Sequence, residues 1–322
     1  MKTVNYQKFK DSQNCKNYQN YQNHTRKISA ILIIALIITS VLFFAPDAPS
    51  LQADASVASS DKAQIDYINT KATGTVDIKV LAKTDKKVKV SISKGDSKYD
   101  YDLKGNGTTE RYPLQYGNGE YTIKVLIQTE GIKYSVALSS KYTLNLKDSK
   151  TPFKYANQLV NYTSKSTVAK KAKEFVKNAG AKTDIEKVEA IYVQVIKMTY
   201  DNDKASSVQS GYIPDVDKIY NAGKGICFDY ASVFAAMLRS QGIHAKLVMG
   251  YVKVPNSDKP VYHAWNEFYL KDKGGWFKIN EMKFDGQKFE RIDPTFESTG
   301  NSSKTVIQWI GDGKNYEKSY EF

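Results

Sequence analysis

The spacing of hydrophobic residues changes near residue 153 of this 322-residue chain, and this change restricts the possible folds most. Before it, hydrophobic and polar residues alternate with a period of two, as along strands with one buried face. After it, hydrophobic residues recur every three to four positions, as on amphipathic helices. The chain is therefore predicted to contain an all-β part followed by a part with helices.

The predicted all-β part covers residues 56–150. It contains six short alternating runs, and glycine-containing turns such as Gly105-Asn106-Gly107 separate most of them. Short strands with turn signals between them are typical of an immunoglobulin-like β-sandwich. The segment has neither cysteine nor histidine, so we predict a binding or spacer module that carries no chemistry of its own.

The second part, residues 151–322, is predicted to be an α+β domain. Thr183 and Glu186 form a capping-box pattern that opens a helix, and Gly242 follows the end of another helix. Strand patterns come after the helices, and helices followed by an antiparallel sheet indicate the α+β class. The predicted helices are 166–179, one that begins at 183, and 227–240; the predicted strands are 244–252, 262–270, 276–282 and 288–292.

Residues 1–55 are predicted to be a cytoplasmic tail followed by a signal or anchor segment. Residues 28–45 are apolar except for three polar side chains, and the 27 residues before them carry six basic side chains against one acid. A basic flank stays on the cytoplasmic side, so we predict that the rest of the chain is exported. The apolar stretch suits either a cleaved signal peptide, with Ala53-Asp54-Ala55 as the cleavage site, or a retained anchor. The predicted location is therefore outside the cell, either anchored to the membrane or secreted to the cell wall.

The net charge of +13 suits an anionic partner, but it does not indicate nucleic acid. Only four of the 47 basic residues are arginines, and the lysines are interspersed with 34 acidic residues. Proteins that read nucleic-acid sequence depend on arginine, so we predict no nucleic-acid partner. An anionic cell wall beside an exported protein is the simpler explanation of the charge.

Cysteine and histidine are rare, which limits the possible chemistry. Two cysteines and three histidines are too few for a disulfide framework or a metal centre of these residues, and we predict neither a metal nor a cofactor. Cys15 precedes the apolar segment, so Cys227 is the one thiol in the exported part. Cys227 begins a predicted helix, where the free N–H groups favour a thiolate. It is therefore either a nucleophile or a small buried side chain.

A nucleophilic cysteine needs a base, and His244 and His263 are the two histidines in the exported part. The predicted helix carries the chain about 20 Å away from Cys227, and His244 lies at that far end. The next strand brings the chain back over roughly 25 Å, so His263 begins the following strand near Cys227. We therefore predict His263 as the base and His244 as a structural histidine. The candidates for the group that orients His263 are Asp293, Glu267, Asp285 and Asp272.

Five short motifs follow one another in the second part of the chain. They are Tyr200-Asp201, Gly225-Ile226-Cys227, Gly242-Ile243, His263-Ala264-Trp265 and Asp293-Pro294-Thr295. In this order they resemble the transglutaminase-like domain family, which shares its core with papain-type cysteine peptidases, over the stretch 183–298. The resemblance implies a papain/transglutaminase-like core of helices plus an antiparallel sheet. It also implies Cys227 as nucleophile, His263 as base and Asp293 as the orienting carboxylate.

The separation of 30 residues between His263 and Asp293 is about twice that of many relatives in this family. A simple meander through the strands predicted at 276–282 and 288–292 would place Asp293 at the wrong end of the sheet. We therefore predict that residues 271–286 make an excursion, with Asp285-Gly286 as its closing turn.

Together these features predict an exported cysteine acyl-transfer enzyme that acts on protein or peptide amides at the cell envelope. Transfer of the acyl group to water would make it a peptidase or amidase, and transfer to an amine would make it a transglutaminase. Its partners would be protein or peptide substrates, cell-wall peptides among them, and the membrane if the N-terminal segment is retained. The alternative is a non-catalytic binding or structural module of the envelope that keeps this fold.

Overall fold

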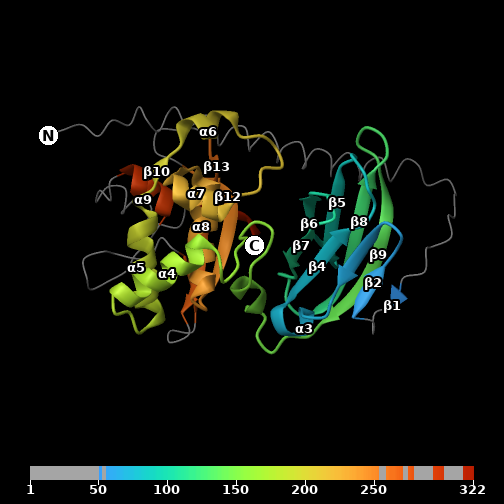
Figure 1. Cartoon of the computed structure of the whole chain (residues 1–322), viewed down its shortest axis with the longest axis horizontal. Helices are drawn as coiled ribbons and strands as arrows, with labels where there is room; N and C mark the ends of the chain where they lie inside the picture. The colour runs from blue at the N-terminus through green and yellow to red at the C-terminus, as the bar shows by residue number, and fades with distance from the viewer. Residues whose placement is uncertain (1–50, 53–55, 254–258, 271–274, 279–292, 301–314) are drawn as a thin grey trace. The chain divides into compact units, whose positions relative to one another are not determined.

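The computed structural model describes residues 51–52, 56–253, 259–270, 275–278, 293–300 and 315–322. The chain divides into two compact units (Figure 1). Of the described residues, the first unit contains those up to Gln158 together with Phe322, and the second contains those from Leu159 to Glu321. No helix of the described ranges is long and apolar enough to cross a membrane. The apolar segment predicted at residues 28–45 lies outside the described residues.

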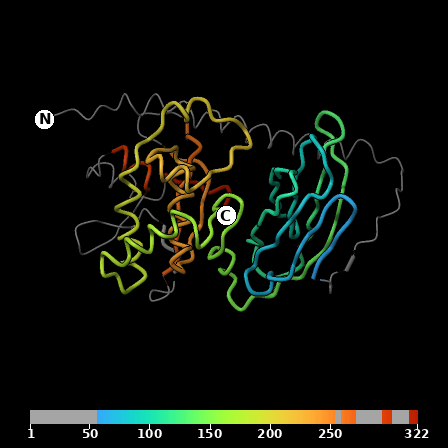
Figure 2. The backbone as a smooth tube through the Cα atoms, viewed as in Figure 1, coloured from blue at the N-terminus to red at the C-terminus, as the bar shows by residue number. Residues whose placement is uncertain are grey.

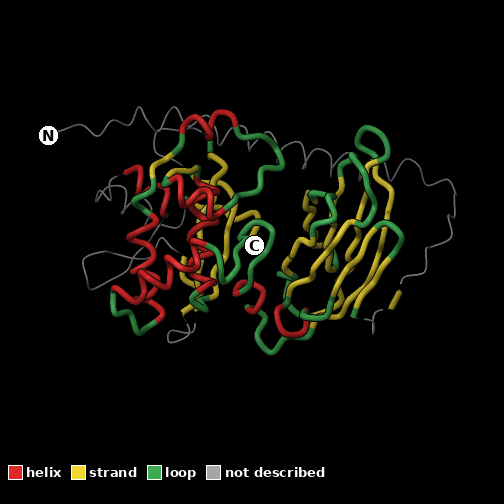
Figure 3. Tube along the Cα trace, viewed as in Figure 1, coloured by secondary structure: helices red, strands yellow, loops and turns green. Residues whose placement is uncertain are grey.

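The first unit consists almost entirely of strands, which form two sheets (Figure 3). One sheet has the strand order β1-β9-β8-β5-β6 and the other β2-β3-β4-β7. Every pair is antiparallel except β1 with β9. The elements are β1 (Leu51–Gln52), β2 (Val57–Ser59), β3 (Ala63–Asp66), helix α3 (Thr70–Thr73), β4 (Thr75–Val80), β5 (Val88–Lys94), β6 (Ser97–Leu103), β7 (Thr109–Pro113), β8 (Gly119–Gln128), β9 (Tyr134–Leu144) and the 3₁₀-helix η1 (Thr151–Lys154).

Alternate side chains of these strands form the core of the first unit. Val88, Val90 and Ile92 of β5 are buried while the residues between them are half-buried, as a period of two requires. Side chains of the two sheets meet in this core, because Tyr67 after β3 stacks on Tyr142 of β9 with ring centroids 4.5 Å apart. The immunoglobulin-like topology and the division at residue 150 stay predictions.

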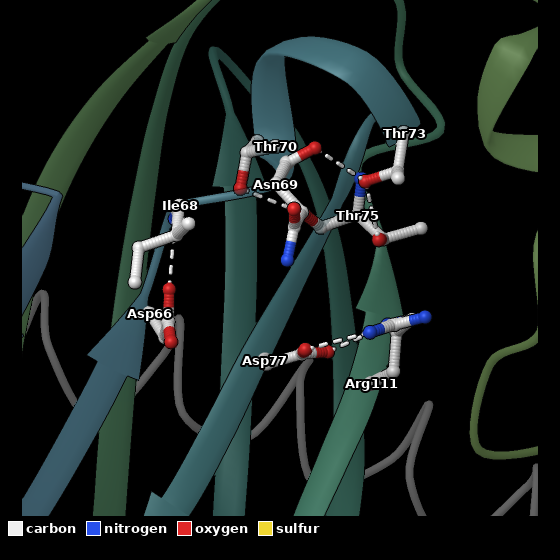
Figure 4. A network of polar contacts seen from close by, with 8 residues as sticks. All are labelled: Asp66, Ile68, Asn69, Thr70, Thr73, Thr75, Asp77 and Arg111. Atoms are coloured by element: carbon white, nitrogen blue, oxygen red, sulfur yellow. Dashed lines mark hydrogen bonds and ion pairs between the residues drawn. The ribbon is translucent and has the colours of Figure 1, made fainter.

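Polar side chains fix the corner between β3 and β4 and the pairing of β4 with β7 (Figure 4). In the corner, the hydroxyl of Thr70 donates a 2.7 Å hydrogen bond to the carbonyl of Thr75. On the sheet, Arg111 of β7 donates two hydrogen bonds of 2.7 Å to the carboxylate of Asp77 in β4. A bidentate pair of this kind holds the register of neighbouring strands better than a single contact does.

The second unit combines helices with a four-stranded antiparallel sheet of order β14-β13-β12-β15. A separate pair of two-residue strands, β10 and β11, runs parallel. The helices are α4 (Thr167–Asn178), α5 (Asp184–Val195), α6 (Asn202–Ser207), α7 (Val216–Ala222), α8 (Cys227–Ser240) and α9 (Pro294–Gly300). The strands are β10 (Thr199–Tyr200), β11 (Lys224–Gly225), β12 (His244–Val252), β13 (Val261–Leu270), β14 (Gly275–Lys278) and β15 (Tyr316–Glu321).

Helix α8 is the centre of the second unit (Figure 2). Its residues from Phe228 to Arg239 are all buried, because the helix contacts β12 and β13 as well as α4 and α5. Asn266 of β13 is buried, and its amide donates to the carbonyls of Ala231 in α8, at 2.8 Å, and Lys246 in β12, at 3.1 Å. This side chain therefore fixes the position of β13 relative to α8.

The α+β class of this part of the chain is confirmed. The capping box is also present: Thr183 accepts the N–H of Glu186, and the Glu186 carboxylate accepts the N–H of Thr183. Helix α8 and strand β12 have the predicted bounds. The strand predicted at 276–282 is described only at Gly275–Lys278, and the one at 288–292 lies outside the described residues, as does the Asp285-Gly286 turn.

Candidate active site

Cys227 is the first residue of α8, and the elements before it fix its position. Strand β11 ends at Gly225, and Ile226 forms the N-cap of the helix. The neighbouring strand β10 pairs with β11, and the N–H of Asp201 just after it donates a 3.0 Å hydrogen bond to the carbonyl of Gly225. Cys227 is half-buried and lies at a helix N-terminus, an environment that favours a thiolate.

A buried carboxylate braces the turn before Cys227. Asp229 is fully buried, and its side chain accepts a 2.9 Å hydrogen bond from the N–H of Ile226. Gly225 passes so close to this carboxylate that a Cβ atom there would lie 2.6 Å from the Cβ of Asp229. Packing therefore requires the glycine two residues before Cys227.

His263 is the third residue of β13 and lies opposite Gly250 of β12. A Cβ atom at Gly250 would overlap the carbonyl oxygen of Glu317 and lie 2.9 Å from the ring of Trp265. Because Gly250 has no side chain, the backbone of β15 and the ring of Trp265 can pack directly against β12 at this position. The imidazole of His263 is 2% exposed and stacks on Phe296, with ring centroids 4.4 Å apart.

Asp293 is fully buried, and both of its carboxylate oxygens are engaged. Oδ2 lies 2.6 Å from Nε2 of His263 and accepts a 3.2 Å hydrogen bond from the hydroxyl of Tyr316. Oδ1 accepts the backbone N–H groups of Thr295, at 3.0 Å, and Phe296, at 3.1 Å, in the first turn of α9. The carboxylate therefore caps α9 and orients His263 at the same time.

The electrostatic surroundings of His263 favour its charged form. Burial, the largest single cause, lowers the pKa of His263, but the charge of Asp293, its hydrogen bond and the contact with Cys227 together outweigh burial and raise the pKa to about 10. Because Nε2 faces Asp293, Nδ1 is the ring nitrogen available to Cys227. A protonated imidazole beside the thiol favours the thiolate. Chemically, the site can present a sulfur nucleophile next to a proton donor.

The structure brings together the three residues that were predicted as a site, Cys227, His263 and Asp293. His244 lies opposite Tyr269, six residues further along β13 than His263, so about 20 Å of strand separate the two histidines. Glu267, the alternative orienting group, instead lies near the ammonium groups of Lys246 and Lys318. Asp272 and Asp285 lie outside the described residues.

Among the described residues, no three His, Cys, Asp or Glu side chains could hold a metal ion.

Two features of this site were not predicted from the sequence. The first is helix α9, which begins at Pro294 directly after Asp293. An N-cap aspartate followed by proline at the first helical position was the signal for a helix start. Tyr316 was also missed; a single tyrosine far along the chain carries no pattern that points to Asp293.

Residues 169–280 match the transglutaminase-like superfamily. No curated protein matches the chain. Among solved structures, a proposed cysteine protease from Cytophaga hutchinsonii is 19% identical, with a TM-score of 0.32; the match covers 60% of this chain and 65% of that one.

Two further solved structures match at lower identity. The periplasmic domain of TgpA from Pseudomonas aeruginosa is 12% identical, with a TM-score of 0.31, and the match covers 79% of this chain and 99% of that one. Red sea bream transglutaminase is also 12% identical, with a TM-score of 0.27, and the match covers 76% of this chain and 55% of that one.

The family assignment depends on the sequence match alone. The matched segment contains Cys227 and His263, whereas Asp293 lies beyond its end. Residues 169–280 of this chain are therefore similar in sequence to the transglutaminase-like superfamily.

Proposed function

We propose that this chain is a cysteine acyl-transfer enzyme that acts on carboxamide or peptide bonds of proteins or peptides. The observation that carries the proposal is the continuous contact from Cys227 through His263 to Asp293. A thiol, an imidazole and a carboxylate in this order match the general arrangement of an activated cysteine nucleophile.

In the proposed first step, the Cys227 thiolate adds to the carbonyl carbon of the substrate amide. The carbonyl oxygen becomes an oxyanion, which N–H groups at the start of α8 can stabilise. The proton on Nδ1 of His263 passes to the leaving nitrogen, the C–N bond breaks, and ammonia or an amine departs. The acyl group remains on the sulfur as a thioester.

In the proposed second step, water or a primary amine attacks the thioester. Nδ1 of the now neutral His263 takes the proton from the attacking group, and Cys227 leaves as a thiolate. Water yields a carboxylic acid, and a lysine amine yields an isopeptide cross-link. Throughout, Asp293 holds the tautomer and orientation of the imidazole.

The proposal is tested with the chain from residue 56 onward, incubated with a glutamine-containing protein and a labelled primary amine. Mass spectrometry follows both amine incorporation and hydrolysis. We expect turnover by the wild type, loss of it in Cys227→Ala and His263→Ala, and near-normal turnover in the matched control His244→Ala. Absence of turnover towards protein, peptide and cell-wall peptide substrates would support the non-catalytic alternative.

We also propose that the enzyme works at the cell envelope. The basic residues before position 28 and the apolar stretch 28–45 support export, and the net charge of +13 suits an anionic wall. Cell fractionation and N-terminal sequencing of the mature protein test this location. An intact, cytoplasmic chain would contradict it.

A further inference from the structure

Two helices begin side by side next to Cys227. Strands β10 and β11 pair in parallel, and each is followed by one N-cap residue and then a helix: Asp201 before α6, and Ile226 before α8. Asp201 caps α6 by accepting the N–H of Lys204 at 3.0 Å. Lys204 is thus the third residue of α6, just as Asp229 is the third residue of α8.

These two third residues form an ion pair. The ammonium of Lys204 lies 2.6 Å from Oδ2 of Asp229. Tyr212 completes the cluster, because its hydroxyl donates to Oδ1 of Asp229 at 2.6 Å and accepts from Lys204 at 2.6 Å. The Lys204 ammonium also lies 4.4 Å from the centre of the Tyr212 ring.

The ion pair compensates for the negative charge of Asp229, which lies close to the Cys227 thiolate. Asp229 braces the N-cap of α8, and a carboxylate there is two residues from the thiol of Cys227. A negative charge at this distance disfavours a thiolate unless a positive charge compensates for it. The Lys204 side chain is 27% exposed and that of Asp229 is fully buried, so the pair is only partly screened by solvent.

We propose that Lys204 is a positioning residue: it neutralises the buried Asp229, so that Asp229 can brace the turn before Cys227 without destabilising the Cys227 thiolate. This inference rests on the proposed function in that it takes Cys227 as the attacking group. Other charged groups that the described residues bring near this corner include His263, which contacts Cys227 and pairs with Asp293, and the Lys224–Asp201 pair, whose lysine is 54% exposed.

The test is the pH dependence of alkylation of Cys227 by iodoacetamide, measured without any substrate. Lys204→Met leaves Asp229 uncompensated, so we expect the apparent pKa of alkylation to rise by about one unit. Asp229→Asn leaves Lys204 uncompensated while the amide oxygen can still accept the Ile226 N–H, so we expect the apparent pKa to fall. The double variant should return towards the wild-type value.

Three further variants serve as controls for fold and for general charge. Lys204→Arg keeps the charge and should keep the wild-type profile. Tyr212→Phe keeps both charges and should shift the profile less than Lys204→Met does. Lys218→Met removes a lysine that pairs with Asp215 at the start of α7 and is 86% exposed, and it should leave the profile unchanged.

Shifts in the same direction for Lys204→Met and Asp229→Asn, or no shift in either, would overturn the inference. If Lys204→Met does not fold, the alkylation profile of Asp229→Asn decides between the two interpretations. The inference predicts a lower apparent pKa for this variant, whereas a purely structural role of Asp229 predicts an unchanged or higher one. The two proposals fail differently. A reactive thiol with opposite shifts but no turnover contradicts the proposed function alone, whereas turnover without these shifts contradicts only the role of Lys204.

Discussion

At the level of single residues, the buried His263–Asp293 pair links the stability of the chain to pH. The pKa of His263 is raised from its ordinary 6.5 to about 10 in the folded chain. The pair therefore stabilises the fold fully below about pH 6.5, and this contribution is lost as the pH rises towards 10. We predict that the free energy of unfolding, measured with urea, falls between pH 6.5 and 9.5.

Asp293→Asn should flatten this dependence, because the variant lacks the charge that raises the pKa of His263. Under the proposed function, its turnover should also drop by about 10²-fold or more. His244→Ala is the control, and it should keep the pH dependence of the wild type. If the free energy of unfolding changes with pH equally in the wild type and in Asp293→Asn, the His263–Asp293 pair does not cause the pH dependence of stability.

Gly225→Ala tests the close approach behind Cys227. A Cβ there would lie 2.6 Å from the Cβ of Asp229, so the braced turn must shift. We predict a loss of about 1–3 kcal/mol in stability, measured by urea unfolding, together with slower alkylation of Cys227 by iodoacetamide.

Gly223→Ala is the matched control for this substitution. Gly223 has a φ of +62°, but apart from its two chain neighbours no described residue has an atom within 4 Å of a Cβ placed there. The control should therefore lose stability through backbone strain alone and leave the alkylation rate unchanged. Equal slowing of alkylation in both variants would contradict the packing argument.

At the level of elements, helix α9 positions Asp293 and is itself held by buried hydrogen bonds. The hydroxyl of Tyr192 in α5 donates to Glu297 of α9 at 2.6 Å, and both side chains are buried. The hydroxyl of Ser298 donates to the carbonyl of Met198 at 2.6 Å. These contacts fix α9, and through it the carboxylate of Asp293.

We predict that Tyr192→Phe destabilises the chain by about 1–3 kcal/mol, because it removes a donor from a buried carboxylate. The variant should also shift the titration of His263, which NMR can follow, since α9 begins beside Asp293. The control Tyr220→Phe, on a half-buried tyrosine of α7, should change stability by less than about 0.5 kcal/mol. A stability loss with an unchanged His263 titration would limit Tyr192 to a structural role.

Elements with strong local signals were predictable from the sequence. Helix α8 and strand β12 agree with prediction to the residue because a continuous buried pattern and Gly242 delimit them. In the first unit, two of the six predicted runs, which begin at Tyr134 and Tyr142, form one strand, β9, since no turn interrupts the pairing with β8. The short strands β2, β3 and β7 are not among the six predicted runs, because none of them contains three alternating hydrophobic residues.

The candidate site was predictable only in part, because some of its residues have roles that depend on tertiary contacts. Cys227 and His263 could be predicted because cysteine and histidine are rare in this chain, and because the lengths of one helix and one strand bring His263 back near Cys227. Lys204, Tyr212 and Tyr316 come from separate segments, and each is an ordinary residue type in an ordinary context. Their roles depend on tertiary contacts that no local pattern encodes.

At the level of the whole molecule, the described contacts group residues 151–158 with the strands of the first unit. The amide of Gln158 donates to the carbonyl of Asp102, at 2.6 Å, and to Glu110, at 3.0 Å. Phe153 in η1 is buried as well. Residues 151–158 therefore complete the first unit.

We predict that a fragment of residues 56–158 folds alone and is more stable than a fragment of residues 56–150. The shorter fragment loses the buried ring of Phe153, worth about 1.5–3 kcal/mol, and leaves the side chain of Glu110 without its bond from Gln158. Circular dichroism should show strand spectra, and urea unfolding should show a higher midpoint for the longer fragment. Gln158→Ala in the longer fragment isolates the contribution of the amide and should lower the midpoint part of the way. Equal midpoints for the two fragments would mean that residues 151–158 add nothing to the first unit, and a non-cooperative transition in both would mean that it does not fold independently.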